Sequence, residues 1–176
     1  TIKNIKSIHD VSDYDDFRIG IEAKFFTMRV NTKIDITTGD VIIPREVSYS
    51  FKLMFEDRYI EVKAYNINTI LAEKIETILS RNISNTRARD FYDVYILLTT
   101  RPSDINKDEL KQAIIKKAEE RNSIVYVENY QKYLTDVLES EDVQKIWDSY
   151  KNKYLYAKDI LFSDIINCIE EVLKKA

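Results

Sequence analysis

Apolar and polar residues alternate along the first third of the chain with the two-residue period of a β-strand. The alternation covers residues 17–25 and returns over residues 32–37. Two further apolar stretches, residues 48–55 and 59–64, flank the polar triplet 56–58. The pattern predicts two strands, of the half-buried kind, followed by a β-hairpin.

Beyond about residue 65 the period lengthens to that of amphipathic helices. Asn66 or Asn68 is suited to cap the first helix. Its apolar side carries Ile70, Leu71, Ile75, Ile78 and Leu79. A second helix is predicted from about Arg89 to Thr99, and residues 106–175 predict three or four more.

Together these elements predict an α+β fold, with a small mixed or antiparallel sheet followed by a helical bundle. The change of period near residue 65 suggests two domains, residues 1–65 and residues 66–176. A chain of 176 residues is long enough for a sizeable core.

Composition narrows the function. With two glycines and two prolines, the chain contains neither a P-loop nor a dinucleotide-binding fingerprint. A net charge of -3 argues against extensive wrapping of nucleic acid but allows a local basic site. The single cysteine, Cys168, excludes an internal disulfide and fits a reducing cytoplasm. No apolar run approaches the length of about 18 residues that would suggest a membrane-spanning helix.

Fixed charge is concentrated where the first two helices meet, within residues 71–95. The first helix carries Lys74 and Arg81, and the second carries Arg89, Asp90 and Asp93. Such a junction can bind an anion such as a nucleotide phosphate. The simpler alternatives are a lysine that reaches water and aspartates that favour a helix start, although arginines are unfavourable there.

Asp35 lies on a predicted strand between two isoleucines, on the opposite face to them. A carboxylate there can hold Mg²⁺, although two-metal chemistry needs two or three acids, and a solvated polar face is the alternative. Asp35 with Glu61 and Lys63 also matches the D…E-x-K pattern of Mg²⁺-dependent nucleases. That pattern arises easily by chance, and the helix order expected for the nuclease fold is not seen.

Four segments together resemble the AbiEii/AbiGii family, the nucleotidyltransferase-like toxins of type IV toxin–antitoxin and abortive-infection systems. They are KIDITTGD (residues 33–40), Pro44-Arg45, YNINTILAEK (residues 65–74) and RARDFYDVY (residues 87–95). The resemblance extends from near Thr1 to about Leu98. It implies a DNA polymerase β-like core, in which a G-S motif and a D-x-D pair precede a third acid on a later strand.

The resemblance assigns roles to individual residues. Asp35 corresponds to the third, metal-binding acid, and Lys33 is its neighbour on the strand. Lys74 and Asp90 correspond to the lysine and aspartate that are functionally important in the family. Arg81, Arg89 and Asp93 are expected to support them. For the intact protein it implies Mg²⁺, an NTP substrate, an RNA acceptor such as tRNA, an antitoxin that acts indirectly, and phage resistance.

The chain departs from the family pattern at one point. No G-S followed by D-x-D precedes Asp35, and the D-x-D within residues 12–16 lacks the G-S and has the composition of a solvated turn. We expect that Thr1 falls just after the missing motif, so that the chain is a C-terminal portion that need not bind a cofactor and transfers no nucleotide alone. A non-catalytic module, in which the helical half binds nucleic acid or a regulatory protein, remains an alternative.

Overall fold

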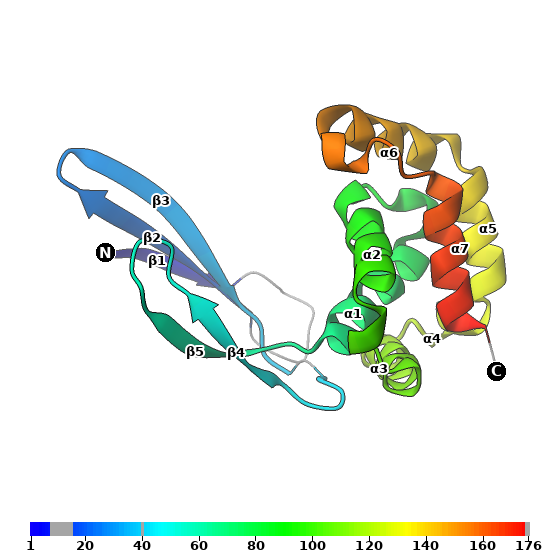
Figure 1. Ribbon diagram of the computed structural model, residues 1–176, viewed down its shortest axis with the longest axis horizontal. Coiled ribbons are helices and arrows are strands. Elements are labelled where there is room, and N and C mark those ends of the chain that lie inside the picture. Colours follow the sequence, from blue (N-terminus) through cyan, green and yellow to red (C-terminus); the bar gives the residue numbers. More distant parts are fainter. Residues whose placement is uncertain (8–15, 40, 175–176) are drawn as a thin grey trace. The chain divides into compact units, whose positions relative to one another are not determined.

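The computed structural model describes residues 1–7, 16–39 and 41–174. Its contacts divide the chain into two compact units, residues 1–40 and residues 41–176. Strands come first and helices follow, which confirms the predicted α+β class (Figure 1). The predicted boundary at residue 65 coincides with the change from strands to helices. That this position also separates two domains stays a prediction.

The first unit is a three-stranded antiparallel sheet in the order β1-β2-β3. Its strands are β1 (Ile2–Ser7), β2 (Phe17–Phe25) and β3 (Met28–Ile36). The prediction for β2 is confirmed, β3 begins four residues before the predicted strand, and β1 was not predicted. The D-x-D segment, residues 12–16, was predicted to be a solvated turn. Its residues 12–15 lie outside the described part of the chain, so this stays a prediction.

Residues alternate between the two faces of this sheet as predicted, but the predicted burial is wrong. Ile19 pairs with Ile34, so apolar residues of neighbouring strands share a face. Ile34 and Ile36 are nevertheless exposed, whereas Glu22 of the polar face is buried. Glu22 forms ion pairs with Lys3, Lys24 and Arg29. A single sheet cannot cover its own apolar face, whereas several long cations can surround one carboxylate.

The second unit opens with the hairpin β4 (Val47–Lys52) and β5 (Tyr59–Ala64). The predicted hairpin is confirmed, although residues 53–55 belong to its turn, which the Leu53 N–H closes by donating to the Arg58 carbonyl at 3.0 Å. Helix α1 (Ile67–Arg81) follows directly.

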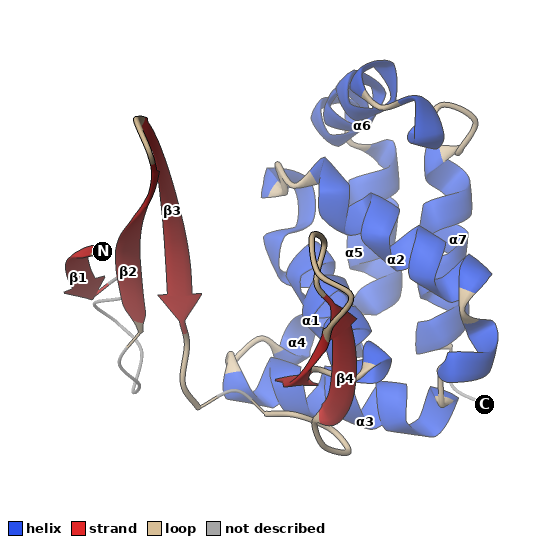
Figure 2. Ribbon diagram, turned by 60° about the vertical axis from the view of Figure 1, so that its left-hand side comes forward, coloured by secondary structure: helices blue, strands red, loops and turns tan. Residues whose placement is uncertain are grey.

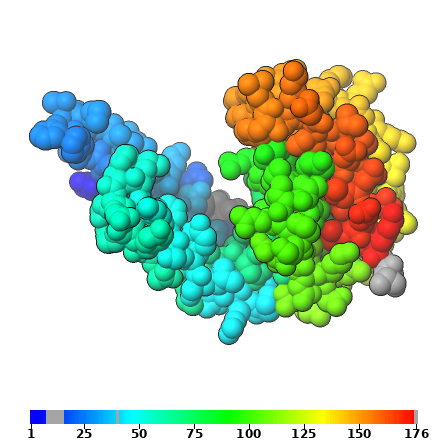
Figure 3. Space-filling model, viewed as in Figure 1, coloured from blue at the N-terminus to red at the C-terminus, as the bar shows by residue number. Residues whose placement is uncertain are grey.

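The remaining helices form one continuous body with α1 (Figures 2 and 3). They are α2 (Ala88–Thr100), α3 (Lys107–Glu120), α4 (Ile124–Glu128), α5 (Tyr130–Glu139), α6 (Glu141–Lys153) and α7 (Phe162–Leu173), with the short 3-10 segments η1 (Asn82–Ser84), η2 (Pro102–Asp104) and η3 (Leu155–Ala157). Five α-helices therefore follow α2 within the described residues, whereas three or four were predicted. Their shared core includes Leu71, Ile75, Ile78, Phe91, Leu110, Leu134, Trp147 and Ile165. None of the described helices is long and apolar enough to cross a membrane.

Asn66, one of the two predicted caps, fixes the start of α1, and Asn68 lies within the helix. Its side-chain oxygen accepts from the Thr69 N–H at 2.9 Å, the usual bond of a helix N-cap. Its side-chain amide donates to the carbonyls of Ile43 and Arg45, both at 2.8 Å. The Thr69 hydroxyl adds a bond to the Ile43 carbonyl at 3.1 Å. These bonds attach the chain before β4 to the first turn of the helix that carries Lys74.

Candidate functional site at the junction of α1 and α2

The junction between α1 and α2 brings one lysine against two aspartates. The helical period places Leu71 and Ile75 in the core and leaves Lys74 at the edge of the apolar face. The chain then turns through η1, and α2 returns beside α1 with Asp90 and Asp93 on adjacent turns. The Lys74 Nζ lies 2.8 Å from Asp90 Oδ1 and 2.8 Å from Asp93 Oδ2.

This cluster is only partly shielded from water. The side chains of Lys74, Asp90 and Asp93 are 22%, 15% and 23% exposed. Burial alone lowers the pKa of Lys74, but the hydrogen bonds and charges of the two aspartates outweigh burial and hold the pKa above its usual value. Lys74 is therefore a fully charged ammonium at neutral pH, and it is already engaged by two carboxylates.

The predicted arginines differ in their relation to the cluster. Arg89 Nε lies 3.7 Å from Asp93 Oδ2, so Arg89 joins the cluster from the solvent side. Arg81 ends α1, is exposed, and forms no ion pair with any described residue. Because Lys74 and Arg89 balance Asp90 and Asp93, the four formal charges cancel. The junction is thus less positive than the sequence suggested.

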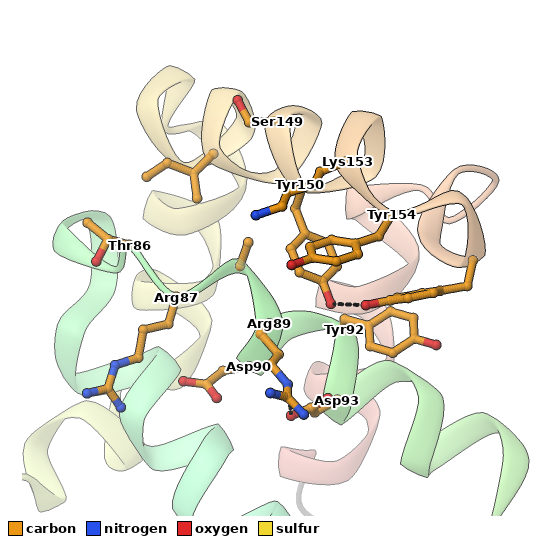
Figure 4. Close-up of a pocket in the computed structure, with 13 residues that line it drawn as sticks. Thr86, Arg87, Arg89, Asp90, Tyr92, Asp93, Ser149, Tyr150, Lys153 and Tyr154 are labelled. Atoms are coloured by element: carbon orange, nitrogen blue, oxygen red, sulfur yellow. Dashed lines mark hydrogen bonds and ion pairs between the residues drawn. The ribbon is translucent and has the colours of Figure 1, made fainter. Parts of the chain in front are cut away.

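Asp90, Asp93 and Arg89 line a cavity of about 810 Å³ (Figure 4). Its opposite wall comes from α6 and η3 and carries Tyr150, Tyr154 and Tyr156, while Tyr92 of α2 completes the aromatic lining. Sequence reasoning assigned the tyrosines to general packing and missed this gathering. Tyr150 and Tyr154 are four residues apart at the C-terminal end of α6, so their proximity to each other could be predicted, but no local pattern links them with Tyr92.

Asp35 and Lys33 lie on β3 of the first unit. The Arg18 guanidinium donates to both carboxylate oxygens of Asp35, at 2.7 and 2.8 Å. These hydrogen bonds hold the pKa of Asp35 below its usual range. Within residues 1–7, 16–39 and 41–174, no three acidic, histidine or cysteine side chains are grouped as a metal site would require. Asp35 is therefore an ionised carboxylate engaged by an arginine.

The residues of the nuclease pattern, Asp35, Glu61 and Lys63, belong to different units, Asp35 to the first and the other two to the second. Glu61 and Lys63 share one face of β5, two residues apart. The Lys63 Nζ lies 3.2 Å from Ser48 Oγ and 3.6 Å from Glu46 Oε1, so it is held by β4 and the residue before it. No described contact joins Glu61 to Lys63, and none favours nuclease chemistry.

Comparison with known proteins identifies one relationship. A family model described as "Nucleotidyl transferase AbiEii toxin, Type IV TA system" matches residues 1–168. No curated protein and no solved structure matches the chain. The matched range includes both helices of the junction and continues through α6 and η3 to the first half of α7.

Proposed function

Since the chain belongs to the AbiEii family of nucleotidyltransferase toxins of type IV toxin–antitoxin systems, we propose that the junction of α1 and α2 serves nucleotidyl transfer. In that reaction a nucleoside monophosphate passes from an NTP to an acceptor hydroxyl, and pyrophosphate leaves. Lys74 contacts a phosphate of the NTP, and Asp90 holds Lys74 in position. Asp93, Arg89 and Arg81 support this contact.

The observation that carries this proposal is the placement of the Lys74 ammonium, 2.8 Å from each of two aspartates, Asp90 and Asp93, that line a cavity. A triphosphate carries several acceptor oxygens and can replace one carboxylate while the other keeps the lysine in place. A fixed cation of this kind stabilises the negative charge that develops on the phosphates during transfer.

The described residues do not fit a complete Mg²⁺ site, because no three potential ligands are grouped among them and Asp35 already accepts from Arg18. Asp35, with Lys33 beside it on β3, is proposed only as one ligand of a metal site. Because no G-S and D-x-D pair precedes Asp35 in the sequence, this chain by itself is expected to transfer no nucleotide.

The biological setting follows the family. We propose an RNA acceptor, with tRNA as one candidate, a cognate antitoxin that acts indirectly, and a role in phage resistance in the cytoplasm.

The test is equilibrium binding of each of the four NTPs to the chain by calorimetry, before and after Lys74→Met. The variant keeps the length of the side chain and removes the charge, and we expect at least about tenfold weaker binding, since one lost charge-assisted bond costs about 1.5–3 kcal/mol. Lys116→Met is the matched control, because Lys116 also lies on a helix and pairs with one acid, Glu119, at 2.7 Å.

Equal binding by the wild type and the Lys74→Met variant would refute the role of Lys74. Transfer itself is measured with NTPs labelled at the α-phosphate and total RNA as acceptor. We expect no labelled RNA with this chain alone, and Mg²⁺-dependent labelling would refute that expectation.

A further inference from the structure

The tyrosines beside the junction form a continuous aromatic wall (Figure 4). The ring centroids of Tyr150 and Tyr154 are 4.7 Å apart, and those of Tyr154 and Tyr156 are 5.4 Å apart with the rings nearly parallel. Tyr92 approaches Tyr156 at 4.8 Å. The hydroxyls of Tyr150 and Tyr156 hydrogen-bond at 3.1 Å, which fixes the two rings in relation to each other.

Part of this wall faces water rather than the core. Tyr156 is 58% exposed, and the neighbouring Leu155 is 84% exposed. Packing therefore does not account for both residues, since a tyrosine that only fills a core buries most of its ring. An ordered, rigid ring open to solvent at the rim of a cavity is available to a planar ligand.

The rim also carries cations without acidic partners. Arg87, at the start of α2, and Lys153, at the end of α6, both line the cavity. Neither forms an ion pair with any residue in the described part of the chain. The Lys153 Nζ lies 5.3 Å from the Tyr154 ring centroid, so its charge sits beside the aromatic wall. Arg89 adds a third cation, only loosely paired at 3.7 Å.

We propose that this cavity binds one nucleotide unit, with its base stacked on the exposed ring of Tyr156 and its phosphate directed to Lys153. Aromatic faces accept any base, while neighbouring cations hold the phosphate, which is the combination that proteins use for unpaired nucleotides. The volume of about 810 Å³ suits a single unit of this size. The inference rests on the proposed function, because it supplies the substrate subsite next to Lys74.

Two sources can supply such a unit, a free NTP or the unpaired end of an acceptor strand. Both present the same base and phosphate, so the experiment must separate them. Binding is therefore measured by calorimetry with each NTP, with a single-stranded RNA octamer and with inorganic triphosphate, which lacks a base.

The first variant is Tyr156→Leu, which keeps apolar bulk and removes the aromatic face. Its matched control is Tyr59→Leu, because Tyr59 of the hairpin is 57% exposed and lies outside the cavity. We expect Tyr156→Leu to weaken binding of the NTPs or of the octamer at least about fivefold, which corresponds to one lost stacking contact. Binding of inorganic triphosphate should not change.

The second variant is Lys153→Gln, with the exposed Lys158→Gln as control. If the ligand is a strand end, the slope of log K against log salt should decrease by about 0.7, the contribution of one phosphate contact on a single strand. An effect confined to the NTPs identifies the NTP as the occupant, and an effect confined to the octamer identifies the strand.

The proposal is overturned if the wild type binds neither ligand, or if Tyr156→Leu has no greater effect than Tyr59→Leu. Failure of the proposed function is a different result. In that case Lys74→Met leaves the binding of inorganic triphosphate unchanged, whatever the effect of Tyr156→Leu.

Discussion

Replacing Asp93 by asparagine tests the balance of charge around Lys74. The substitution keeps the size of the side chain and removes one of the two carboxylates that lie 2.8 Å from the Lys74 Nζ. Because Asp90 remains at 2.8 Å, Lys74 keeps one partner. We therefore expect two effects of different sign, a small loss of folding stability and a gain in affinity for a triphosphate.

The loss of stability can be bounded from the exposure of the cluster. Exposed ion pairs contribute about 0–1 kcal/mol, whereas breaking a fully buried pair costs about 3–5 kcal/mol. With side chains 15–23% exposed, the cluster lies between these cases. Asp93→Asn should cost about 1 kcal/mol, and the double variant with Asp90→Asn about 2–4 kcal/mol, since Lys74 then loses both carboxylates.

The gain in affinity follows from the net charge. The four charges of the cluster cancel in the wild type and sum to +1 in Asp93→Asn. Two unit charges about 4 Å apart interact by about 1 kcal/mol in water and about 4 kcal/mol near a protein surface. A gain near 1.4 kcal/mol, or about tenfold in affinity for inorganic triphosphate, is therefore expected.

Calorimetry measures the affinity and urea unfolding measures the stability. Asp142→Asn is the control, because Asp142 is an exposed aspartate in the first turn of α6 that pairs with Lys145 at 3.6 Å. The reasoning is refuted if Asp93→Asn binds triphosphate no more tightly than Asp142→Asn does.

Three further predictions concern stability and reactivity. Asn66→Ala removes the cap of α1 and the bonds to the Ile43 and Arg45 carbonyls, so it should lower the free energy of unfolding by about 2–3 kcal/mol in urea. Asn106→Ala, which removes only the cap of α3, should cost about 1 kcal/mol, and equal losses would contradict this account. Folding raises the pKa of Lys74, so the contribution of Lys74 to the free energy of unfolding is complete below about pH 10 and should decline as the pH rises through the folded-state pKa. If the free energy of unfolding already declined between pH 7 and 9 in the wild type but not in Lys74→Met, this prediction would be wrong. Burial, followed by the charges of Glu171 and Asp164, raises the pKa of Cys168, so iodoacetamide should alkylate it at pH 7.5 more slowly than it alkylates free cysteine, and faster alkylation would count against that environment.

Local sequence patterns predicted an element correctly wherever the pattern lay within that single strand or helix. The alternation of β2, the period of α1 and the cap at Asn66 all appear in the structure. Strand β1 was missed because a register shift lies between Ile2 and Asn4. Ile2 pairs with Ile21 and Ile5 with Ile19, so three positions along β1 correspond to two along β2. An irregularity of this kind interrupts the two-residue period by which a strand is recognised.

The charged residues of the cluster could be predicted from the sequence, but the cancellation of their charges could not. Asp90 and Asp93 are three residues apart, so one helical face presents both. That both contact Lys74 depends on the turn between α1 and α2, which spacing does not specify. The aromatic wall depends on α6 and η3 lying against α2, more than 50 residues later in the chain, so no local pattern contains it.

Substitutions of Lys74 and Asp93 also distinguish a structural role of the cluster from a role in phosphate binding. If the cluster only joins α1 to α2, Lys74→Met and Asp93→Asn both lower stability, and neither changes the binding of a triphosphate. If Lys74 contacts phosphate, the same two variants still lower stability but shift binding in opposite directions, because one removes the cation and the other removes its competitor. The sign of the Asp93→Asn effect is therefore more informative than the loss on Lys74→Met, since damage to the fold can weaken binding but has no reason to strengthen it.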